Sequence, residues 1–198
     1  MTLILISLIE RDWMNWPANR QILRSTSELK KAEALTFALC ETCLGWAGVI
    51  GSYNGLKKVI LPLKSKEAVL GQIASYGCEA ENHDIASFAE LTDRIRRYFD
   101  GEPVDFADKL DLAGTTRFQQ NVWLTVRNIP RGETRNYGWV ANQLGLPKAA
   151  RAVGQALGRN PVPIVIPCHR VIGSDGKLGG FGGGVEIKKL LLKLEQSV

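Results

Sequence analysis

Hydrophobic positions in the first half of the chain predict a β-hairpin. Residues 46–53 and 56–61 are rich in side chains that suit a pleated sheet, and Asn54-Gly55 separates the two runs. Because Asn-Gly tolerates the positive φ angles of a type I′ turn, we expect the runs to pair as antiparallel strands. Pro62 is expected to close the second strand, since proline cannot donate to a strand ladder.

A helical pattern follows the hairpin. Apolar side chains recur at helical intervals until Gly101 ends the pattern, namely Phe88, Leu91, Ile95 and Tyr98. Ser87 and Glu90 have the spacing of a capping box, so this amphipathic helix is predicted to begin at Ser87.

The next segment, residues 100–114, is acidic, contains a proline and shows no period. Such a segment is typical of a connection rather than a helix or a strand. We therefore expect a boundary here between two domains, residues 1–112 and residues 113–198.

Short helical patterns dominate the second half. Phe118, Val122 and Val126 recur every four residues behind Thr115 and Thr116, which can cap a helix. Two further patterns cover residues 137–144 and 148–157, and Gly145-Leu146-Pro147 joins them. A three-residue turn that contains glycine between two short helices is typical of a helix-turn-helix.

The C-terminal part combines a strand, a loop and a last helix. Residues 162–166 are predicted as a buried strand, and residues 173–184 as a glycine-rich loop. The last helix carries apolar side chains on one face at Ile187, Leu190, Leu191 and Leu194. Taken together, the pattern predicts an α/β protein.

The charges are divided unequally between the halves. Residues 1–112 carry 13 basic and 16 acidic side chains, a net of −3, whereas residues 113–198 carry 12 and 4, a net of +8. A basic half is typical of a protein that binds a polyanion, most often nucleic acid, although a solvated surface gives the same count. The basic residues on or beside the two short helices favour DNA: Arg135, Lys148, Arg151 and Arg159.

The composition excludes several classes of protein. A hydrophobic content of 45% in 198 residues is that of a globular chain, and no apolar run approaches the roughly 20 residues of a membrane span. Residues 3–9 lack the basic flank and the cleavage site of a secretory signal. We therefore expect a cytoplasmic protein, or a nuclear one in a eukaryote.

The cysteines of the first half leave three alternatives open. Cys40, Cys43, Cys78 and His83 form a C-x2-C and C-x4-H set that could hold a structural zinc ion. Cys40 and Cys43 could instead form a disulfide. Free buried thiols are the third possibility, and the one expected in the cytoplasm.

Cys168 and His169 form the chemically most informative pair in the sequence. A thiolate is a strong nucleophile, and it needs a base or a nearby cation to exist at neutral pH; His169 and Arg170 could supply both. Because neighbouring side chains of an extended segment point to opposite faces, we expect His169 to act through a turn or a water molecule. An inert buried cysteine beside a surface histidine is the alternative.

The second half resembles the catalytic domain of the O6-alkylguanine-DNA alkyltransferases, also called methylated-DNA–protein-cysteine methyltransferases. The resemblance covers the chain from about Phe118 onward. The matching motifs, in order, are Tyr137-Gly138, Ala149-Ala150-Arg151-Ala152-Val153-Gly154, Asn160-Pro161 and Ile166-Pro167-Cys168-His169-Arg170-Val171. It implies a ribonuclease-H-like sheet domain followed by a mainly helical winged helix-turn-helix domain, and the first half matches this in outline only.

The resemblance also implies roles for individual residues. Cys168 would accept an alkyl group irreversibly from O6 of guanine, or O4 of thymine, so that each molecule acts once. His169 would draw the thiol proton through water, while Glu195 holds the imidazole ring. Asn160 would support the turn beside the cysteine, and Tyr137 would donate a proton or a hydrogen bond to the departing guanine. Without the resemblance, Glu195 and Tyr137 would be interpreted as a solvated charge and a packing residue.

The same resemblance assigns a DNA-binding surface. The damaged base has to leave the duplex to reach Cys168, and Arg151 would fill the space it vacates. Ala149 and Ala150 are small enough for their helix to approach the minor groove, and Tyr137 would also contact the DNA. We expect steeply salt-dependent binding that depends on residues 113–170.

Val171, Phe181 and Gly182 are expected to line the substrate pocket. The family commonly has tyrosine where this chain has Phe181, so a hydrogen bond usually made there is not expected. The surrounding glycines match neither a phosphate-binding loop nor a dinucleotide-binding motif. Our hypothesis is that the pocket admits a benzyl group as well as a methyl group.

The partner implied is double-stranded DNA that contains O6-alkylguanine, bound by a monomer without a cofactor or a membrane. A cysteine hydrolase that uses Cys168, His169 and Asn160 is a second possibility, but such enzymes place the histidine far from the cysteine in sequence. A third is a non-catalytic lesion sensor, and in this family sensors replace the cysteine.

Overall fold

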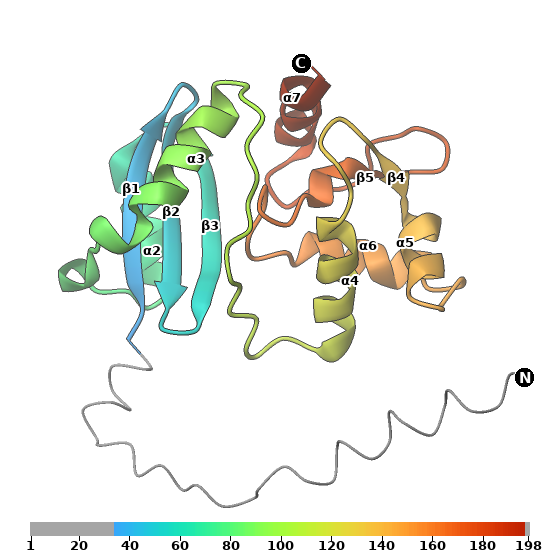
Figure 1. Cartoon of the computed structure of the whole chain (residues 1–198), viewed down its shortest axis with the longest axis horizontal. Coiled ribbons are helices and arrows are strands. Elements are labelled where there is room, and N and C mark those ends of the chain that lie inside the picture. Colours follow the sequence, from blue (N-terminus) through green and yellow to red (C-terminus); the bar gives the residue numbers. More distant parts are fainter. Residues whose placement is uncertain (1–33, 197–198) are drawn as a thin grey trace, which may run out of the picture. The chain divides into compact units, whose positions relative to one another are not determined.

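The computed structural model describes residues 34–196, so the apolar run at residues 3–9 lies outside the described part (Figure 1). The first half contains an antiparallel sheet in the order β1-β2-β3, formed by β1 (Thr36–Thr42), β2 (Gly45–Ser52) and β3 (Gly55–Leu63). β3 is therefore an edge strand, and it is the strand on which the second half packs.

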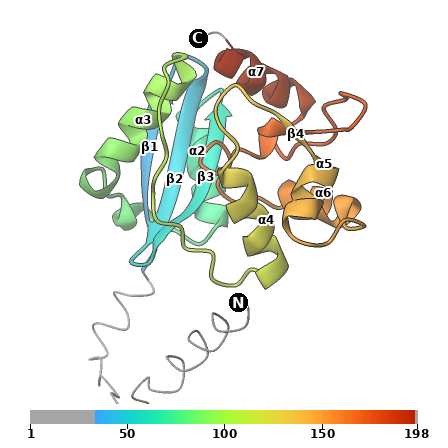
Figure 2. The ribbon, with the colours of Figure 1, turned by 45° about the vertical axis from the view of Figure 1, so that its right-hand side comes forward.

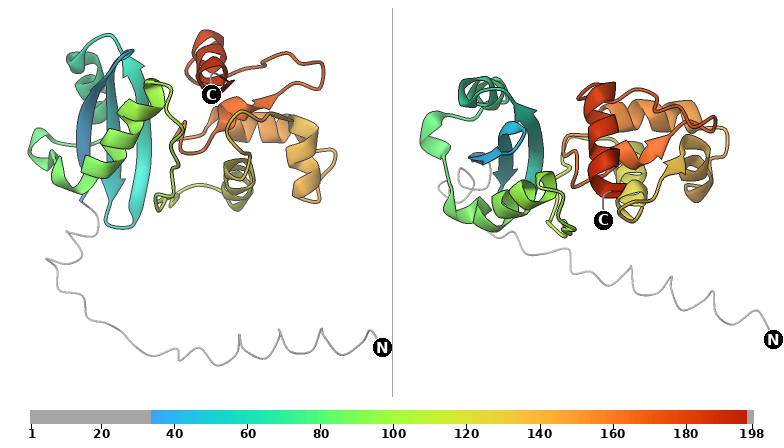
Figure 3. Two further views of the ribbon diagram at one scale, coloured as in Figure 1. Left: turned by 45° about the horizontal axis from the view of Figure 1, so that its top comes forward. Right: turned by 90° about the horizontal axis from the view of Figure 1, so that it is seen from above.

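Helices cover both faces of this sheet. Because side chains alternate along a strand, Val49 and Ile50 point to opposite faces, and they belong to different hydrophobic clusters. Ile50 packs with the buried residues of α2 (Lys66–Ser75), and Val49 with those of α3 (Ala89–Phe99). The view from above shows the sheet between the two helices (Figure 3).

The predicted hairpin is confirmed, but its turn and its end differ from the prediction. Asn54 does not have a positive φ angle; Gly55 has one, at +138°, so the turn is not type I′. Pro62 lies inside β3 rather than after it, which an edge strand permits because one side of its backbone needs no ladder partner. The sequence pattern did not reveal β1 or α2.

The predicted capping box at the start of α3 is wrong. A short 3₁₀ turn, η2 (Ala86–Phe88), precedes α3, and the helix begins at Ala89 without a side-chain cap. Ser87 instead donates its backbone N–H to Oδ1 of Asp84, at 3.0 Å. The apolar face of the helix is buried as the period predicts, and a second 3₁₀ turn, η1 (Ala80–Asn82), lies earlier in the chain.

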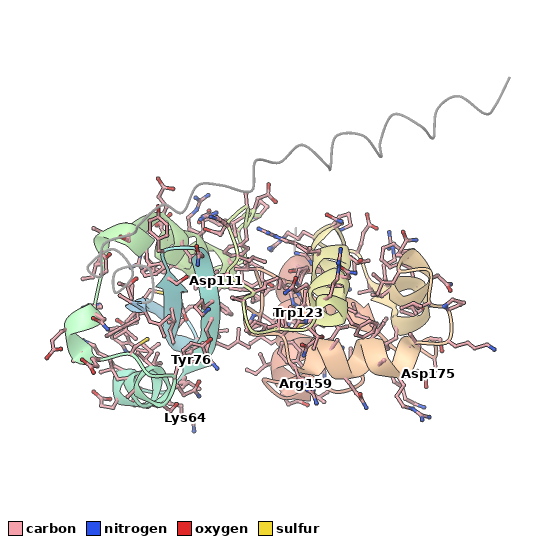
Figure 4. All side chains as sticks on the ribbon, turned by 90° about the horizontal axis from the view of Figure 1, so that it is seen from below. Lys64, Tyr76, Asp111, Trp123, Arg159 and Asp175 are labelled. Carbon is pink, nitrogen blue, oxygen red and sulfur yellow. The ribbon has the colours of Figure 1, made fainter. Side chains whose placement is uncertain are left out.

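The irregular segment predicted as a boundary runs back along β3. Leu56 donates its N–H to the carbonyl of Lys109 at 2.8 Å, and its own carbonyl accepts from the N–H of Asp111 at 2.9 Å. The Asp111 carboxylate in turn accepts hydrogen bonds from Ser52 and Lys57 (Figure 4). The connection is therefore fixed to the sheet at its edge.

Within the described residues, the second half is built from four α-helices, one 3₁₀ turn and two very short strands. These are α4 (Arg117–Arg127), β4 (Arg135–Asn136), α5 (Tyr137–Gln143), α6 (Ala150–Gly158), η3 (Cys168–Arg170), β5 (Val171–Ile172) and α7 (Val185–Gln196). All four predicted helices are confirmed, and Thr116 caps α4 in a capping box with Gln119. The buried Trp123, labelled in Figure 4, joins α4 to α6. Its Nε1 donates to the carbonyl of Ala156, at 2.9 Å.

The strand predicted at residues 162–166 is wrong. These residues are buried as expected, but they form a turn closed by the N–H of Ile166, which donates to the carbonyl of Val162 at 2.9 Å. Ile164 has a φ angle of +66°, which is rare for a branched side chain. A short apolar run suits a buried turn as well as a buried strand, and the prolines at 161, 163 and 167 leave few donors for a ladder.

The cysteines of the first half are free thiols in the structure. Cys40 and Cys78 are buried, Cys43 is exposed, and no disulfide joins Cys40 to Cys43. Across residues 34–196, no group of three or more His, Cys, Asp or Glu side chains is placed to hold a metal ion. Cys40, Cys43, Cys78 and His83, the residues of the zinc alternative, form no such group in the described part of the chain. In the same range, no helix is long and apolar enough to cross a membrane.

Candidate active site

Cys168 begins the 3₁₀ turn η3, and its side chain is held from one side by Asn160. The sulfur is nearly buried, and Asn160 donates from Nδ2 both to Cys168 Sγ at 3.0 Å and to the carbonyl of Ile166 at 2.9 Å. Oδ1 of Asn160 accepts the N–H of Val162, at 3.0 Å. One amide group thus fixes the buried turn and the sulfur that follows it.

His169 and Glu195 form a completely buried pair. His169 Nε2 lies 2.8 Å from Oε1 of Glu195. An ionised carboxylate only accepts hydrogen bonds, so Nε2 carries the proton and Nδ1 keeps its lone pair. Nδ1 is buried and has no hydrogen-bond partner among residues 34–196. The ring is therefore prepared to accept a proton at Nδ1.

Arg170 interacts with Glu195 and not with the sulfur, contrary to the expectation that it would supply positive charge to Cys168. Its Nε and Nη2 donate to the two carboxylate oxygens of Glu195, at 2.8 and 2.9 Å. Its Nη1 donates to the carbonyl of Ile129, at 2.5 Å. A two-pronged pair of this kind holds the carboxylate in one orientation.

Lys188 is the cation that acts on Cys168, and the sequence pattern did not reveal it. Its ammonium group is buried and donates to the carbonyls of Val171 and Leu178. Burial lowers the pKa of Lys188 to about 8, although the nearby Cys168 opposes this effect. The lysine therefore links β5, the glycine-rich loop and α7 beside the sulfur of Cys168.

The electrostatics define the resting state of the site. Burial raises the pKa of Cys168, and the opposing effects of Asn160 and Lys188 do not outweigh it. Burial also lowers the pKa of His169, despite Glu195. For Glu195, burial acts to raise the pKa, but the hydrogen bonds from His169 and Arg170 dominate and lower it. At neutral pH the site thus holds a thiol, a neutral imidazole and a carboxylate.

Tyr137 lies at the start of α5 and shares the electrostatic environment of Cys168. Burial raises the pKa of its hydroxyl, and the nearby cysteine adds to this effect. The ring packs closely against two glycines: a Cβ atom at Gly179 would lie 2.7 Å from the Tyr137 hydroxyl, and one at Gly154 would lie 3.6 Å from the ring. The glycine-rich loop can therefore pass directly over this tyrosine.

A cavity of about 400 Å³ opens beside Cys168. The sheet and the glycine-rich loop both contribute to its lining, which includes Leu61, Pro62, Leu157, Asn160, Cys168, Phe181, Gly182 and Ile187. Phe181 and Gly182 are thus at the expected place. Val171 is not part of this lining, because it is fully buried in β5 and offers its carbonyl to Lys188.

The residues predicted to bind DNA, Ala149, Ala150 and Arg151, do not line this cavity, although Leu157 and Gly158 at the other end of α6 do. α5 and α6 pack against each other and against α4 (Figure 2). Ala149 and Ala150 are half-buried at the start of α6, and the side chain of Arg151 is exposed. Arg127 instead turns inward, where its Nη2 donates to the carbonyls of Phe106 and Asp108.

Comparisons with known proteins agree with this geometry. Residues 117–197 match the family described as 6-O-methylguanine DNA methyltransferase, DNA binding domain. A methylated-DNA–protein-cysteine methyltransferase from Methanosarcina acetivorans is 43% identical over 161 residues, which are 81% of this chain and 98% of the relative. The chain belongs to the methylated-DNA–protein-cysteine methyltransferase family.

Other members of this methyltransferase family support the same placement. The enzyme of Mycobacterium bovis is 54% identical over 114 residues, 58% of this chain and 68% of the relative. The crystal structure of Mycobacterium tuberculosis O6-methylguanine methyltransferase superposes with a TM-score of 0.68 at 40% identity, covering 82% of this chain and 93% of that one. The M. tuberculosis protein has also been solved in complex with DNA.

Membership of the methyltransferase family does not by itself single out Tyr98, Arg131 or Lys188, which surround the buried His169–Glu195 pair. Tyr98 comes from α3 in the first half, and its hydroxyl donates to Oε1 of Glu195 at 2.8 Å. In the sequence it is one more apolar position of an amphipathic helix. Only its location beside a glutamate 97 residues later reveals the contact.

Proposed function

We propose that this protein repairs DNA by moving an alkyl group from O6 of guanine, or O4 of thymine, to Cys168. The observation that carries the proposal is the arrangement of Cys168 Sγ at a cavity, with Asn160 on the sulfur and the His169–Glu195 pair buried behind it. Membership of the methyltransferase family supports the same reaction.

The first step activates the sulfur. The thiol proton passes through a water molecule to Nδ1 of His169, the ring nitrogen that keeps its lone pair. Glu195 stabilises the imidazolium that results, as an acid partner stabilises the histidine of a catalytic triad. The Asn160 amide and the Lys188 ammonium stabilise the thiolate, because both lower the pKa of Cys168.

The second step transfers the alkyl group. Sγ attacks the alkyl carbon, an S–C bond forms as the C–O6 bond breaks, and the bonding pair of electrons stays on the guanine. The guanine anion then takes a proton from water, and the imidazolium of His169 returns its proton to water. Tyr137 assists the departure by donating a hydrogen bond from its hydroxyl. Since burial raises the pKa of that hydroxyl, a hydrogen bond is favoured over complete proton transfer.

The product is a thioether on Cys168. Such a bond resists hydrolysis, and the described residues around Cys168 include no group that would regenerate the thiol from it, so each molecule acts once. The reaction uses no cofactor, because the cysteine itself accepts the alkyl group.

Duplex DNA is the proposed partner, and the exposed basic side chains of the second half support this assignment. A damaged base has to rotate out of the stack to reach Cys168. Arg151 would occupy the vacated space, while Ala149 and Ala150 let α6 lie close to the minor groove. The relative from M. tuberculosis has been solved with DNA, which agrees with this assignment.

We also propose the finer architecture that the family implies. Residues 1–112 would form a ribonuclease-H-like domain, and residues 113–198 a winged helix-turn-helix domain, in a protein that acts as a monomer. The sheet with helices on both faces and the packing of α5 on α6 support the two assignments.

The cavity beside Cys168 supports a broad range of alkyl groups. Its volume of about 400 Å³ exceeds the space that a methyl group needs, and the aromatic ring of Phe181 offers an apolar wall. We propose that benzyl groups are transferred as well. Single-turnover rates on duplex DNA with O6-benzylguanine and O6-methylguanine test this; a benzyl rate thousands of times slower would contradict it.

Mass spectrometry tests the function itself. After incubation with duplex DNA that contains O6-methylguanine, the peptide with Cys168 is expected to gain the mass of one methyl group. Cys168→Ala should show no adduct, and Cys43→Ala, which removes an exposed thiol, should react as the wild type does. An unmodified Cys168, or repeated turnover by one molecule as in a hydrolase, would overturn the assignment.

A further inference from the structure

Tyr98, in the first half of the chain, contacts the buried pair His169 and Glu195 of the second half. It is 1% exposed, and its hydroxyl donates to Glu195 Oε1 at 2.8 Å while lying 3.4 Å from Nε2 of His169. Oε1 is the same oxygen that accepts the N–H of His169. The hydroxyl therefore shares its acceptor with the imidazole ring.

The ring of Tyr98 is held rigidly enough to define a position for that hydroxyl. Phe99 and Phe106 contact its ring edge-on, with centroids at 5.4 and 5.8 Å. The guanidinium of Arg131 lies over the ring at 5.5 Å, and its Nη2 donates to the carbonyls of Gly101 and Leu194. Arg131 thus connects the end of α3 to the residue that precedes Glu195.

The charges around His169 explain why the Tyr98 hydroxyl affects the basicity of the imidazole ring. Arg170 from η3 and Lys188 from α7 act on His169, Arg131 from the segment after α4 acts on Tyr98, and Glu195 is the single carboxylate among these groups. Each donor to Oε1 takes up part of the carboxylate charge. Less of that charge remains to hold a proton on the imidazole ring.

We propose that Tyr98 is a positioning residue of the proton relay, whose hydroxyl fixes Oε1 of Glu195 and thereby sets the orientation and the basicity of His169. This inference rests on the proposed function. It gives the sheet half of the molecule an influence on the chemistry that passes through Glu195, because α3 supplies the hydroxyl. Burial and the adjacent Glu195 raise the pKa of Tyr98, so the hydroxyl stays protonated and remains a donor.

Removing the hydroxyl leaves Oε1 with one donor fewer. Oε1 then accepts only from His169 and Arg170, so more of its charge acts on His169, and the imidazole loses a neighbouring group 3.4 Å from Nε2. In Tyr98→Phe we therefore expect a higher pKa of His169 and a less well-defined ring orientation. The first effect moves the acid limb of the rate profile to higher pH, and the second slows transfer about tenfold at saturating DNA.

Single-turnover kinetics with duplex DNA that contains O6-methylguanine test the inference. Tyr98→Phe should lower the rate at saturating DNA about tenfold, while the DNA concentration that gives half of that rate stays unchanged. Tyr53→Phe, which removes a hydroxyl that is largely exposed, is the matched control and should behave as the wild type does. Equal rates and equal pH profiles for Tyr98→Phe and wild type would overturn the proposal.

A double-mutant cycle with Glu195→Gln asks whether Tyr98 acts through the glutamate. If it does, Tyr98→Phe should slow the wild type about tenfold and the Glu195→Gln protein hardly at all. An equal decrease in both backgrounds would mean that Tyr98 acts by another route, and the proposal would fail.

Nitrogen-15 NMR provides a readout that does not depend on alkyl transfer. The chain has two histidines, so His83 is an internal reference for His169. The wild type should show His169 protonated at Nε2, and Tyr98→Phe should raise its pKa relative to that of the wild type. Protonation of the wild-type ring at Nδ1 would contradict the geometry even if the variant failed to fold. If wild type formed no adduct but the NMR shifts were as expected, the proposed function would fail and the contact would stand.

Discussion

Asn160 Nδ2 lies 3.0 Å from the sulfur of Cys168 and 2.9 Å from the carbonyl of Ile166. The donor that steadies the turn is therefore also the donor that stabilises negative charge on the sulfur. Because the hydrogen bond grows stronger as the thiol loses its proton, it stabilises the thiolate more than the thiol. It should therefore lower the barrier to alkyl transfer.

Replacement of Asn160 should consequently slow alkyl transfer. A hydrogen bond to a charged group contributes about 1.5–3 kcal/mol, so Asn160→Ala is expected to reduce the single-turnover rate roughly 10- to 100-fold and to raise the pKa of Cys168. Rates measured across pH report both effects. Asn121→Ala, at an exposed position of α4, is the control, and a rate within twofold of wild type for Asn160→Ala would argue against this role.

Gly179 should be intolerant of a side chain. Its φ angle is +66°, and a Cβ atom there would lie 2.7 Å from the hydroxyl of Tyr137. Gly179→Ala is therefore expected to lower the free energy of unfolding by about 1–2 kcal/mol and to displace Tyr137, with a clear loss of transfer rate. Gly180→Ala, which meets no atom within 4 Å, should leave both quantities near the wild-type values. Equal behaviour of the two variants would refute the prediction.

DNA binding should depend on exposed cations and not on the total charge of the second half. Arg151→Ala and Lys148→Ala remove exposed charges near the start of α6, and each should weaken binding and reduce the slope of log affinity against log salt by about 1. Arg127→Ala should mainly lower the melting temperature, because that guanidinium is bound to backbone carbonyls. Lys64→Ala, an exposed change in the first half, should alter neither. Salt titrations by fluorescence anisotropy distinguish these outcomes.

Stability should fall on mild acidification because of His169. Its pKa in the folded protein lies below the ordinary value of 6.5, so the unfolded chain binds a proton that the folded chain does not. The free energy of unfolding is therefore expected to decrease as pH falls below about 6.5. Glu195, whose pKa is also lowered, keeps its contribution above its ordinary value of 4.5 and loses it only at lower pH.

Thermal melts between pH 7 and pH 5 measure the histidine contribution. The melting temperature of the wild type should fall across this range, whereas that of His169→Gln should change less. His83→Gln should keep the wild-type slope. A wild-type melting temperature that is constant over this range would be inconsistent with a buried neutral histidine.

Periodicity was sufficient to predict the elements whose burial is regular. α3, α4 and α6 each bury a stripe of mainly apolar side chains, and the hairpin pairs as its alternation indicates. α7 buries Leu191 between two charged residues, Lys188 and Glu195. β1 and α2 were not predicted, because β1 follows a polar stretch and α2 buries only Val69 and Ile73. At residues 162–166 a strand was predicted where the chain forms a turn, because burial alone does not distinguish a strand from a turn.

The site was predictable only where its residues are close in sequence or belong to a motif of the family. Cys168 and His169 are adjacent, and Asn160 lies eight residues before the cysteine. Lys188 lies among the apolar positions of α7, so a pattern that counts hydrophobic residues treats it as a surface charge. Tyr98 requires the packing of the two halves, which no local pattern contains. The sequence and the family resemblance therefore indicated Cys168, His169, Asn160 and Glu195, but not Lys188 or Tyr98.

The edge of β3 is already occupied by the molecule's own backbone. Leu56 pairs with Lys109 and Asp111, and the N–H of Val59 donates to the carbonyl of Pro161 at 3.0 Å. Contacts between main-chain groups do not depend on which side chains are present, so first halves of quite different sequence could support the same second half. The contact of Tyr98 with Glu195 is different, because it depends on a side-chain hydroxyl and is lost when another residue replaces the tyrosine. A chimera that joins the first half of one relative to the second half of another would thus keep the main-chain contacts at β3. It would keep the proposed proton relay only if its first half had a tyrosine at the position of Tyr98.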